Sequence, residues 1–179
     1  MAKILIIYST IDGHTQKICE RIKKTITKAK IKCDIFNIEE LILKDIEPVL
    51  SNCDKIVLGS SIRFGYHHQL IYKLINAYQS ILDSKPNAFF SVNLVARKPE
   101  KSTALTNPYL QKFLKQIRWK PKKIAVFAGR LEYSKYTFFN RQAMRLIMFI
   151  TKGPTASNTV IEYTDWQQVD NFAISICEM

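Results

Sequence analysis

The amino-acid sequence predicts an α/β fold in which a parallel β-sheet carries helices on both faces. Apolar strand segments alternate with helical segments five times along the 179 residues, which is the order expected of a parallel sheet. Several strands are almost continuously apolar, as strands buried on both faces are. Hydrophobic residues make up 47% of the chain and charged residues 23%, so the chain can bury one sizeable core. We therefore expect a single domain over residues 1–179.

The first element is an apolar strand, Ile4–Ile7, followed by a loop rich in hydroxyl side chains and then by a helix. Ile18, Ile22 and Ile26 are spaced four residues apart, so they lie on one face of that helix. A strand, a tight polar loop and a helix N-terminus form an anion-binding geometry, because free backbone N–H groups and the helix dipole both favour negative charge there. The loop residues are Ser9, Thr10, Ile11, Asp12, Gly13, His14 and Thr15.

This loop fits neither of two common nucleotide-binding motifs. The P-loop requires lysine after its last glycine, whereas Gly13 is followed by His14 and Thr15. The dinucleotide fingerprint requires three glycines at fixed spacing, and this loop has one. Two interpretations remain: a loop of the kind that flavodoxins use for the phosphate of FMN, and an ordinary strand–helix connection with a threonine-capped helix.

The rest of the chain supplies four more strands and the helices between them. The expected strands are Lys32–Asn37, Lys55–Ser61, Ala88–Val95 and Lys123–Gly129. The expected helices cover 70–82 and 108–117, and a terminal helix follows a capping box at Thr164–Gln167. The stretch Ile38–Leu50 is predicted to be a loop with one helical turn that ends near Pro48.

Ligands of such sheets bind beyond the carboxyl ends of the strands, where the strand order reverses. The loops that gather there begin at Ser9, Ser60, Ser91 and Gly129. Three of these four loops carry hydroxyl residues directly after an apolar strand, which indicates a binding site at this edge. The loop after the third strand is expected to cover Ile62–His68.

The cysteines indicate packing residues in a reducing compartment. Cys19, Cys33, Cys53 and Cys177 form no Cys-x-x-Cys pair, so we expect free thiols and no zinc site. The apolar run at the N-terminus is too short for a signal peptide, and no apolar stretch approaches the length of a membrane span.

The net charge of +12 is concentrated in one stretch of the chain. Between Arg97 and Lys123 the sequence has nine basic residues and a single acidic one, Glu100. Such a run suits a polyanion, an anionic membrane surface, an anionic substrate or simply a solvated surface. No motif that reads nucleic acid accompanies the run, and its aromatic residues lie elsewhere, so we expect no nucleic-acid partner.

One segment, residues 130–158, exceeds what a five-stranded sheet needs. Its core is predicted as a helix over Thr137–Ile150, ended by Gly153–Pro154. Arg141 and Arg145 lie on one side of this helix. Apolar residues occupy much of the rest, namely Phe139, Met144, Ile147, Met148 and Ile150. The pattern is typical either of a helix lying on a membrane surface or of a helix whose apolar face packs on the sheet, and it is compatible with a homo-oligomer.

Four stretches, together with this insertion, resemble the menaquinone-dependent protoporphyrinogen IX dehydrogenase (protoporphyrinogen oxidase) family of bacterial flavodoxin-like FMN proteins. The matching stretches are Tyr8–Thr15, Gly59–Gly65, Ser91–Lys101 and Tyr163–Trp166. The resemblance covers nearly the whole chain, and the family motif varies at the positions of Ile11 and His14. It implies a flavodoxin-like five-stranded parallel sheet with a helical insertion between the fifth strand and the last helix.

The resemblance also implies an activity, a cofactor and a location. The activity is FMN-dependent oxidation of protoporphyrinogen IX to protoporphyrin IX in haem biosynthesis, with electrons passed to menaquinone or another membrane quinone. The location is the cytoplasmic face of the inner membrane, with peripheral contact through residues 137–150. Carried over position by position, the loop Ser9–Thr15 would hold the FMN phosphate. Residues expected to line the isoalloxazine are Ser60, Ser61, Ile62, Arg63, Phe64, Gly65, Ser91, Val92, Asn93, Leu94 and Val95.

The residues themselves assign no acid, base or metal ligand. The sequence shows no Ser-His-Asp order, no metal cluster and no paired carboxylates at a strand end, and a flavin carries its redox chemistry itself. His67 and His68 follow the third strand, where they either approach the flavin or flank the start of a helix. Basic residues near the fourth and fifth strands are expected to meet the substrate's propionates, namely Arg97, Lys98, Lys101 and Arg130.

Two alternatives use the same fold. One is an NAD(P)H:quinone reductase, for which the sequence supplies no second nucleotide site. The other is a soluble electron carrier, for which a charge of +12 is unsuited because carrier flavodoxins dock through acidic surfaces.

Overall fold

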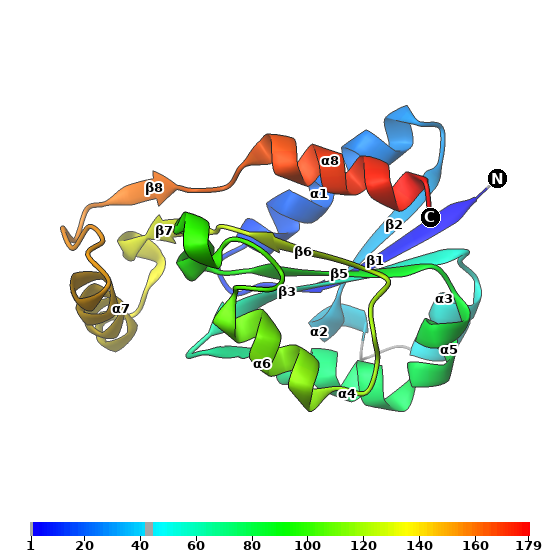
Figure 1. Ribbon diagram of the computed structural model, residues 1–179, viewed down its shortest axis with the longest axis horizontal. Helices are drawn as coiled ribbons and strands as arrows, with labels where there is room; N and C mark the ends of the chain where they lie inside the picture. The colour runs from blue at the N-terminus through cyan, green and yellow to red at the C-terminus, as the bar shows by residue number, and fades with distance from the viewer. Residues whose placement is uncertain (1, 42–44) are drawn as a thin grey trace.

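The computed structural model describes residues 2–41 and 45–179, and five parallel strands form its centre in the order β2-β1-β3-β5-β6 (Figure 1). The strands are β1 (Lys3–Ser9), β2 (Lys32–Asn37), β3 (Lys55–Arg63), β5 (Asn87–Val92) and β6 (Lys123–Phe127). The chain starts in the middle of the sheet, builds outward to β2 and then crosses to β3, so the strand order reverses between β1 and β3. The predicted five-stranded parallel sheet is confirmed.

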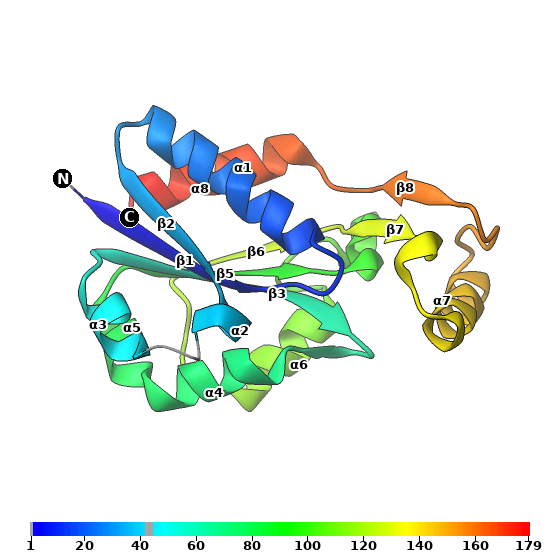
Figure 2. The same ribbon diagram turned by 180° about the vertical axis from the view of Figure 1, so that it is seen from behind.

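Helices cover both faces of the sheet (Figures 1 and 2). One face carries α1 (His14–Lys28) and α8 (Trp166–Cys177), and the other carries α2 (Ile38–Leu41), α3 (Ile46–Ser51), α4 (Gln69–Ala77), α5 (Gln79–Ser84) and α6 (Pro108–Gln116). Alternate residues of β1 serve the two cores, because successive strand side chains point to opposite faces. Ile4 and Ile6 pack with the isoleucines of α1, whereas Leu5 and Ile7 share the second core with Trp119.

Several local predictions differ from the structure, among them the fifth strand, which was expected to reach Gly129 and ends at Phe127. The stretch before β3 forms α2 and α3, and α3 runs through Pro48, because the third position of a helix needs no N–H donor. The predicted end near Pro48 is therefore wrong, and residues 42–44 of that stretch lie outside the described residues. The fourth strand ends at Val92 and not at Val95, because the Asn93 side chain accepts a hydrogen bond from Ala96 N (3.1 Å) and starts a 3-10 turn, Leu94–Arg97. The helical stripe over 70–82 is divided at Tyr78 into α4 and α5.

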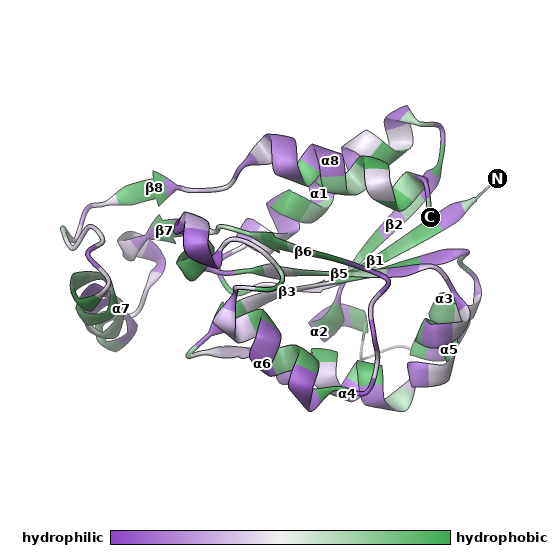
Figure 3. Ribbon diagram, viewed as in Figure 1, coloured by the Kyte–Doolittle hydropathy of each residue, from purple (hydrophilic) through white to green (hydrophobic). Residues whose placement is uncertain are grey.

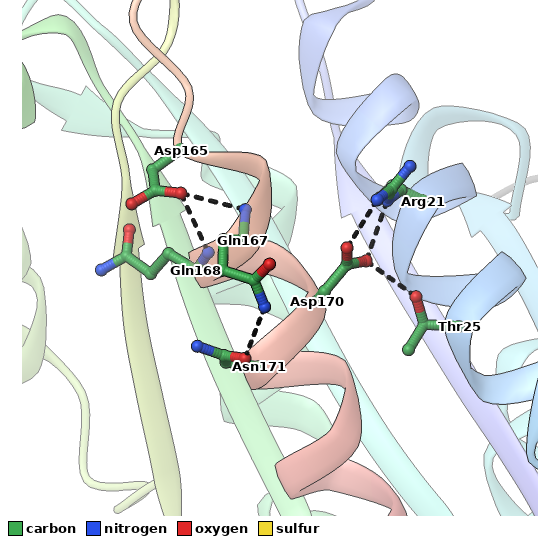
Figure 4. Close-up of polar contacts among 7 residues, drawn as sticks. All are labelled: Arg21, Thr25, Asp165, Gln167, Gln168, Asp170 and Asn171. Atoms are coloured by element: carbon green, nitrogen blue, oxygen red, sulfur yellow. Dashed lines mark hydrogen bonds and ion pairs between the residues drawn. The ribbon is translucent and has the colours of Figure 1, made fainter.

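The capping residue of the last helix is Asp165, not the predicted Thr164. The Asp165 carboxylate accepts hydrogen bonds from the backbone N–H of Gln167 (2.9 Å) and of Gln168 (3.1 Å), as Figure 4 shows. Thr164 is left to donate its hydroxyl hydrogen to the carbonyl of Ala128 (2.8 Å). This difference matters because Thr164 also contacts the first loop of the sheet.

One ion pair fastens α8 to α1 (Figure 4): the Asp170 carboxylate accepts hydrogen bonds from Arg21 Nε and from Thr25 Oγ1, both at 2.8 Å. Hydrogen bonding from Arg21, helped by Thr25, holds the pKa of Asp170 below its ordinary value. Such a carboxylate stabilises the fold above its unfolded pKa of about 3.9, and this contribution is lost as the pH falls through the folded pKa.

We expect Asp170→Asn to lower the melting temperature slightly at pH 7 and to have a smaller effect at pH 2.5, because the exposed pair is worth little and its carboxylate is increasingly protonated in acid. Melting curves of both proteins at the two pH values measure this. Asp83→Asn on α5, which removes a carboxylate whose described contact is the neutral Gln79, is the matched control. An equal loss at both pH values would show that packing, not charge, matters at position 170.

Between β6 and α8 the chain leaves the sheet and forms the insertion, Arg130–Glu162. It consists of β7 (Arg130–Glu132), a 3-10 turn (Tyr133–Lys135), α7 (Phe138–Ile150) and β8 (Val160–Glu162). β7 and β8 pair antiparallel and carry α7 beyond the end of the sheet (Figure 1). At the base, Tyr163 N donates to Gly129 O at 3.1 Å, so the two ends of the insertion lie side by side. The segment is longer than the predicted 130–158 because β8 returns to pair with β7.

The helix predicted over Thr137–Ile150 is confirmed as α7, but it does not pack on the sheet. Met148 is the buried residue of α7, and it joins Leu131 and Tyr133 in a small separate core. Most of the other apolar side chains of α7 are exposed, and Figure 3 shows that this helix, which lies apart from the sheet, is hydrophobic over much of its length. The interpretation that its apolar face packs on the sheet is therefore wrong. Among the described helices, none has the length and apolar character needed to cross a bilayer.

The basic stretch does not form one surface. Arg97 follows the carboxyl end of β5, whereas Lys123 begins the parallel strand β6 at the opposite edge of the sheet. Lys123 donates from Nζ to Ser175 O (2.8 Å), and Lys55 donates to Ile176 O and Cys177 O. These lysines therefore bind the last carbonyls of α8, where the helix dipole favours positive charge.

Candidate functional site

The carboxyl ends of β1, β3 and β5 open onto a cleft of about 680 Å³ whose opposite wall is α7. Most of the residues predicted to bind a cofactor line it. From that set the cleft gathers Thr10, Ile11, Asp12, His14, Thr15, Ser61, Ile62, Arg63, Phe64, Gly65, Val92, Asn93, Leu94 and Val95. Three sequence-distant loops thus meet at the point where the strand order reverses, as expected of this topology.

The first loop presents unused hydrogen-bond donors to the cleft. Gly13 precedes α1 in the left-handed conformation (φ 78°), which glycine adopts without strain, and no side chain caps the helix among the described residues. The first helical bond runs from Lys17 N to Gly13 O, so the N–H groups of the first turn remain available. Thr10 Oγ1 is buried and has no hydrogen-bond partner within the described part of the chain. These donors fit a phosphate group.

Ser9, Ser60 and Ser91 lie behind the cleft wall instead of lining it. The hydroxyls of Ser9 and Ser60 are 2.8 Å apart, and Ser60 accepts a hydrogen bond from His68 N. Ser91 Oγ lies 2.9 Å from His67 Nε2 and accepts a hydrogen bond from Asn93 Nδ2. Buried hydroxyls at three adjacent strand ends therefore hold the loops in register.

The loop predicted over Ile62–His68 is a β-hairpin. β3 continues to Arg63, turns at Phe64 and Gly65, and returns as β4 (Tyr66–His67). Both turn residues have positive φ (50° and 82°), which is costly for a bulky aromatic residue. The strained turn places the exposed ring of Phe64 at the cleft, with the Arg63 guanidinium 5.4 Å from the ring centroid.

The side chains of His67 and His68 stabilise the fold. His67 belongs to β4 of the hairpin and its side chain is buried, with ring centroids 5.5 Å from Phe89 and 4.5 Å from Phe113. Burial lowers the pKa of His67 to about 3, so the imidazole is neutral at physiological pH. The His68 side chain caps α4 by accepting a hydrogen bond from Leu70 N (3.3 Å). Neither histidine lines the cleft.

His14 joins the first loop to the start of α8. Its Nε2 lies 2.6 Å from Thr164 Oγ1, and that hydroxyl gives its hydrogen to Ala128 O. His14 Nε2 must therefore carry the proton and donate it to Thr164. Burial lowers the pKa of His14, which keeps the ring neutral at pH 7. Its Nδ1 is buried and finds no partner among the described residues.

Two of the four basic residues predicted to meet the substrate line the cleft. Arg97 and Arg130 do, whereas Lys98 and Lys101 do not. Arg97 donates to Leu94 O (2.9 Å) and to Thr151 Oγ1 (2.9 Å), so it also ties the turn after β5 to the C-terminus of α7.

The inner side of α7 forms a cleft wall that the sequence reasoning missed. It contributes Asn140, Met144 and Ile147, and the turn before it contributes Lys135 and Tyr136. The spacing of Asn140, Met144 and Ile147 is helical and would have placed them on one face. Helical spacing alone does not show which surface such a face meets, so the sequence predicted the membrane or the sheet as the neighbour of this helix.

The flavodoxin domain family matches residues 5–158 of the chain. Protoporphyrinogen IX dehydrogenase [quinone] from Escherichia coli strain K12 is 40% identical over 177 residues, which cover 99% of this chain and 96% of the relative. The chain belongs to this family. A protein of the same name from Leishmania major is 42% identical over 172 residues, covering 96% of this chain and 73% of the relative.

The predicted family and the oxidoreductase class are confirmed by these relatives. Among solved structures, oxidised flavodoxin 2 from Bacillus cereus aligns with a TM-score of 0.58 at 18% identity, covering 99% of each chain. Flavodoxin 1 from the same organism aligns with a TM-score of 0.57 at 14% identity, covering 99% of this chain and 98% of that one. At these identities the likeness shows the fold, and the predicted flavodoxin-like fold is confirmed.

Proposed function

We propose that this chain uses FMN to oxidise protoporphyrinogen IX to protoporphyrin IX in haem biosynthesis. It passes the electrons to a membrane quinone, and menaquinone is the proposed acceptor. One observation carries the proposal: the flavodoxin-type strand ends face a second wall, α7, in a chain that is 40% identical over 99% of its length to a relative of that name. An electron carrier needs no such wall, because it exchanges electrons at an exposed flavin edge.

The residues of the cleft fit FMN. Thr10 Oγ1 and the first N–H groups of α1 bind the phosphate, where the helix dipole also favours negative charge. The segments Ser61–Gly65 and Val92–Val95 flank the ring, and the exposed side chain of Phe64 shields it from water. Bound FMN supplies the redox chemistry itself. The buried serines behind the wall fix the loops that position it.

The substrate is bound between these loops and α7. Met144 and Ile147 offer apolar contacts to a flat macrocycle, and Asn140 adds one amide to the same wall. Of the four basic residues predicted for this role, Arg97 and Arg130 line the cleft and meet its carboxylates, whereas Lys98 and Lys101 lie outside the lining. Guanidinium groups suit this role because they pair with carboxylates in a bidentate geometry.

The outward face of α7 contacts the membrane that holds the quinone, at its cytoplasmic side. This face consists of Phe138, Phe139, Leu146, Phe149 and Ile150, all exposed. Arg145 turns back and donates to Thr155 O (2.8 Å), and Arg141 donates to Tyr136 O, so neither guanidinium interrupts the apolar face. A contiguous exposed apolar face marks an interaction site, and an amphipathic helix lies in the interface with this face toward the acyl chains. A second copy of the chain is the competing occupant of the same face.

Anaerobic mixing of the FMN-loaded protein with protoporphyrinogen IX and a soluble menaquinone analogue tests the reaction. Porphyrin fluorescence is expected to rise, and quinone is expected to be consumed in proportion. A parallel reaction with NAD(P)H in place of the porphyrinogen tests the reductase alternative. Quinone reduction in the NAD(P)H reaction, together with no rise of porphyrin fluorescence in the first reaction, would refute the proposal.

A further inference from the structure

The anion-binding loop Ser9–Thr15 has no cation of its own. Its one ionisable carboxyl, Asp12, carries the wrong sign for a phosphate site. Burial raises the pKa of Asp12, and the charges of Lys135 and Arg63 act in the opposite direction. A phosphate dianion beside this carboxylate is unfavourable unless positive charge from elsewhere offsets the repulsion.

The start of the insertion brings positive charge to this loop. Lys135 Nζ donates to the backbone carbonyl of Asp12 at 3.2 Å, a contact between residues 123 positions apart in the chain. Lys135 Nζ also lies 3.5 Å from Glu132 Oε2, and Arg130 Nη2 lies 3.1 Å from the same oxygen. Glu132 thus holds two cations against the loop.

Lys135 and Arg130 line the main cleft together with Thr10 and Thr15 of the first loop. A small recess beside the cleft is lined by Asp12, His14, Lys17, Arg130, Glu132 and Lys135. The three basic side chains of this recess, Lys17, Arg130 and Lys135, outnumber its two carboxyl groups. Arg130 Nε is buried without a hydrogen-bond partner in the described ranges, and the Lys135 ammonium has donors beyond the one used for Asp12. Positive charge and unused hydrogen-bond donors therefore lie together at the N-terminus of α1.

We propose that the insertion completes the phosphate site: Lys135, supported by Arg130 and Glu132, binds the FMN phosphate and makes the protein select FMN over riboflavin. This inference rests on the proposed FMN function. It gives the insertion a second role, because the proposed function of its helix, α7, is to contact the substrate and the membrane. Because the same residues precede α7 directly, the cofactor also fastens the insertion to the sheet.

The test compares the affinities of the flavin-free full chain for FMN and for riboflavin, which has the same ring without the phosphate. Dissociation constants are measured by quenching of flavin fluorescence. Lys135→Met is expected to weaken FMN binding about 10- to 100-fold, the range for a lost charge-assisted contact, and to leave riboflavin binding within about twofold. Lys135→Arg is expected to retain the FMN affinity. Lys152→Met, a change at an exposed lysine of the same insertion, is the control and is expected to change neither affinity.

Equal weakening of FMN and riboflavin by Lys135→Met would overturn the proposal, because the effect would then come from a displaced loop. Equal effects of Lys135→Met and Lys152→Met on FMN would also overturn it, because general charge would explain both. A wild-type protein that binds neither flavin would refute the FMN function itself, which is a distinct result.

Discussion

Between pH 6 and pH 4 the free energy of unfolding is expected to fall by about 2.5 kcal/mol because of one buried histidine, His67. In the folded protein this imidazole lies against Phe89 and Phe113, with Ser91 as its hydrogen-bond partner. Desolvation of the charged form lowers its pKa from 6.5 to about 3.

The sign follows from proton binding. Below pH 6.5 the unfolded chain protonates this side chain, whereas the folded protein does not do so until about pH 3. The unfolded state therefore binds more protons across this window, and stability is lost as the pH falls. The contribution is fully present above pH 6.5 and changes by about 1.4 kcal/mol per pH unit in the middle of the window.

Urea unfolding of the wild type and of His67→Gln at pH 7.5, 6, 5 and 4 measures this effect. Glutamine is polar but does not titrate, so the variant is expected to be less stable at pH 7.5 and to lose less stability in acid. The two curves should converge toward pH 4. Parallel curves would show that His67 is protonated in the folded state or reaches solvent.

The second large effect is expected on membrane association. Phe139 and Phe149 are 83% and 74% exposed on the outward face of α7, although each is a large apolar side chain. If each buries its ring at the interface for about 1.5 kcal/mol, replacing both with serine weakens binding to vesicles about 100-fold. Cosedimentation with vesicles of mixed neutral and anionic lipid measures the binding of wild type and of the Phe139→Ser, Phe149→Ser double variant.

Ile174→Ser is the control for this experiment. Ile174 is also exposed (49%), but it lies on α8, and the change is expected to leave vesicle binding unchanged. Unaltered binding of the double variant would exclude α7 as the contact. A different outcome is that the wild type does not bind vesicles and sediments as a dimer, whereas the double variant sediments as a monomer. In that case a second copy of the chain occupies this face.

The sequence was informative where structure depends on neighbours along the chain. The isoleucines of α1 at four-residue spacing predicted both the helix and its buried face, and Gly153–Pro154 located the end of α7. Prediction was weaker at boundaries that a single side chain decides. Asn93 ends β5 early by capping the next turn, and Asp165 outcompetes Thr164 as the cap of α8 because Thr164 bonds Ala128 instead.

Contacts between distant residues could not be predicted in this way. His14 meets Thr164 across 150 positions, and Lys135 meets Asp12 across 123. These contacts depend on where the insertion and the segment after it lie relative to the strand ends. The local periodicity of the sequence does not encode that position. The candidate site was therefore predictable as loops at one edge of a sheet, while the wall opposite those loops was not.

The hydrogen bond between Tyr163 and Gly129 closes the neck of the insertion. Because the neck is already shut, joining these two residues directly would require little additional loop closure and no new path through the sheet. The insertion is therefore a separable part of the chain: it enters and leaves the sheet at one closed point, and its removal would leave the five strands and their helices connected in the same order.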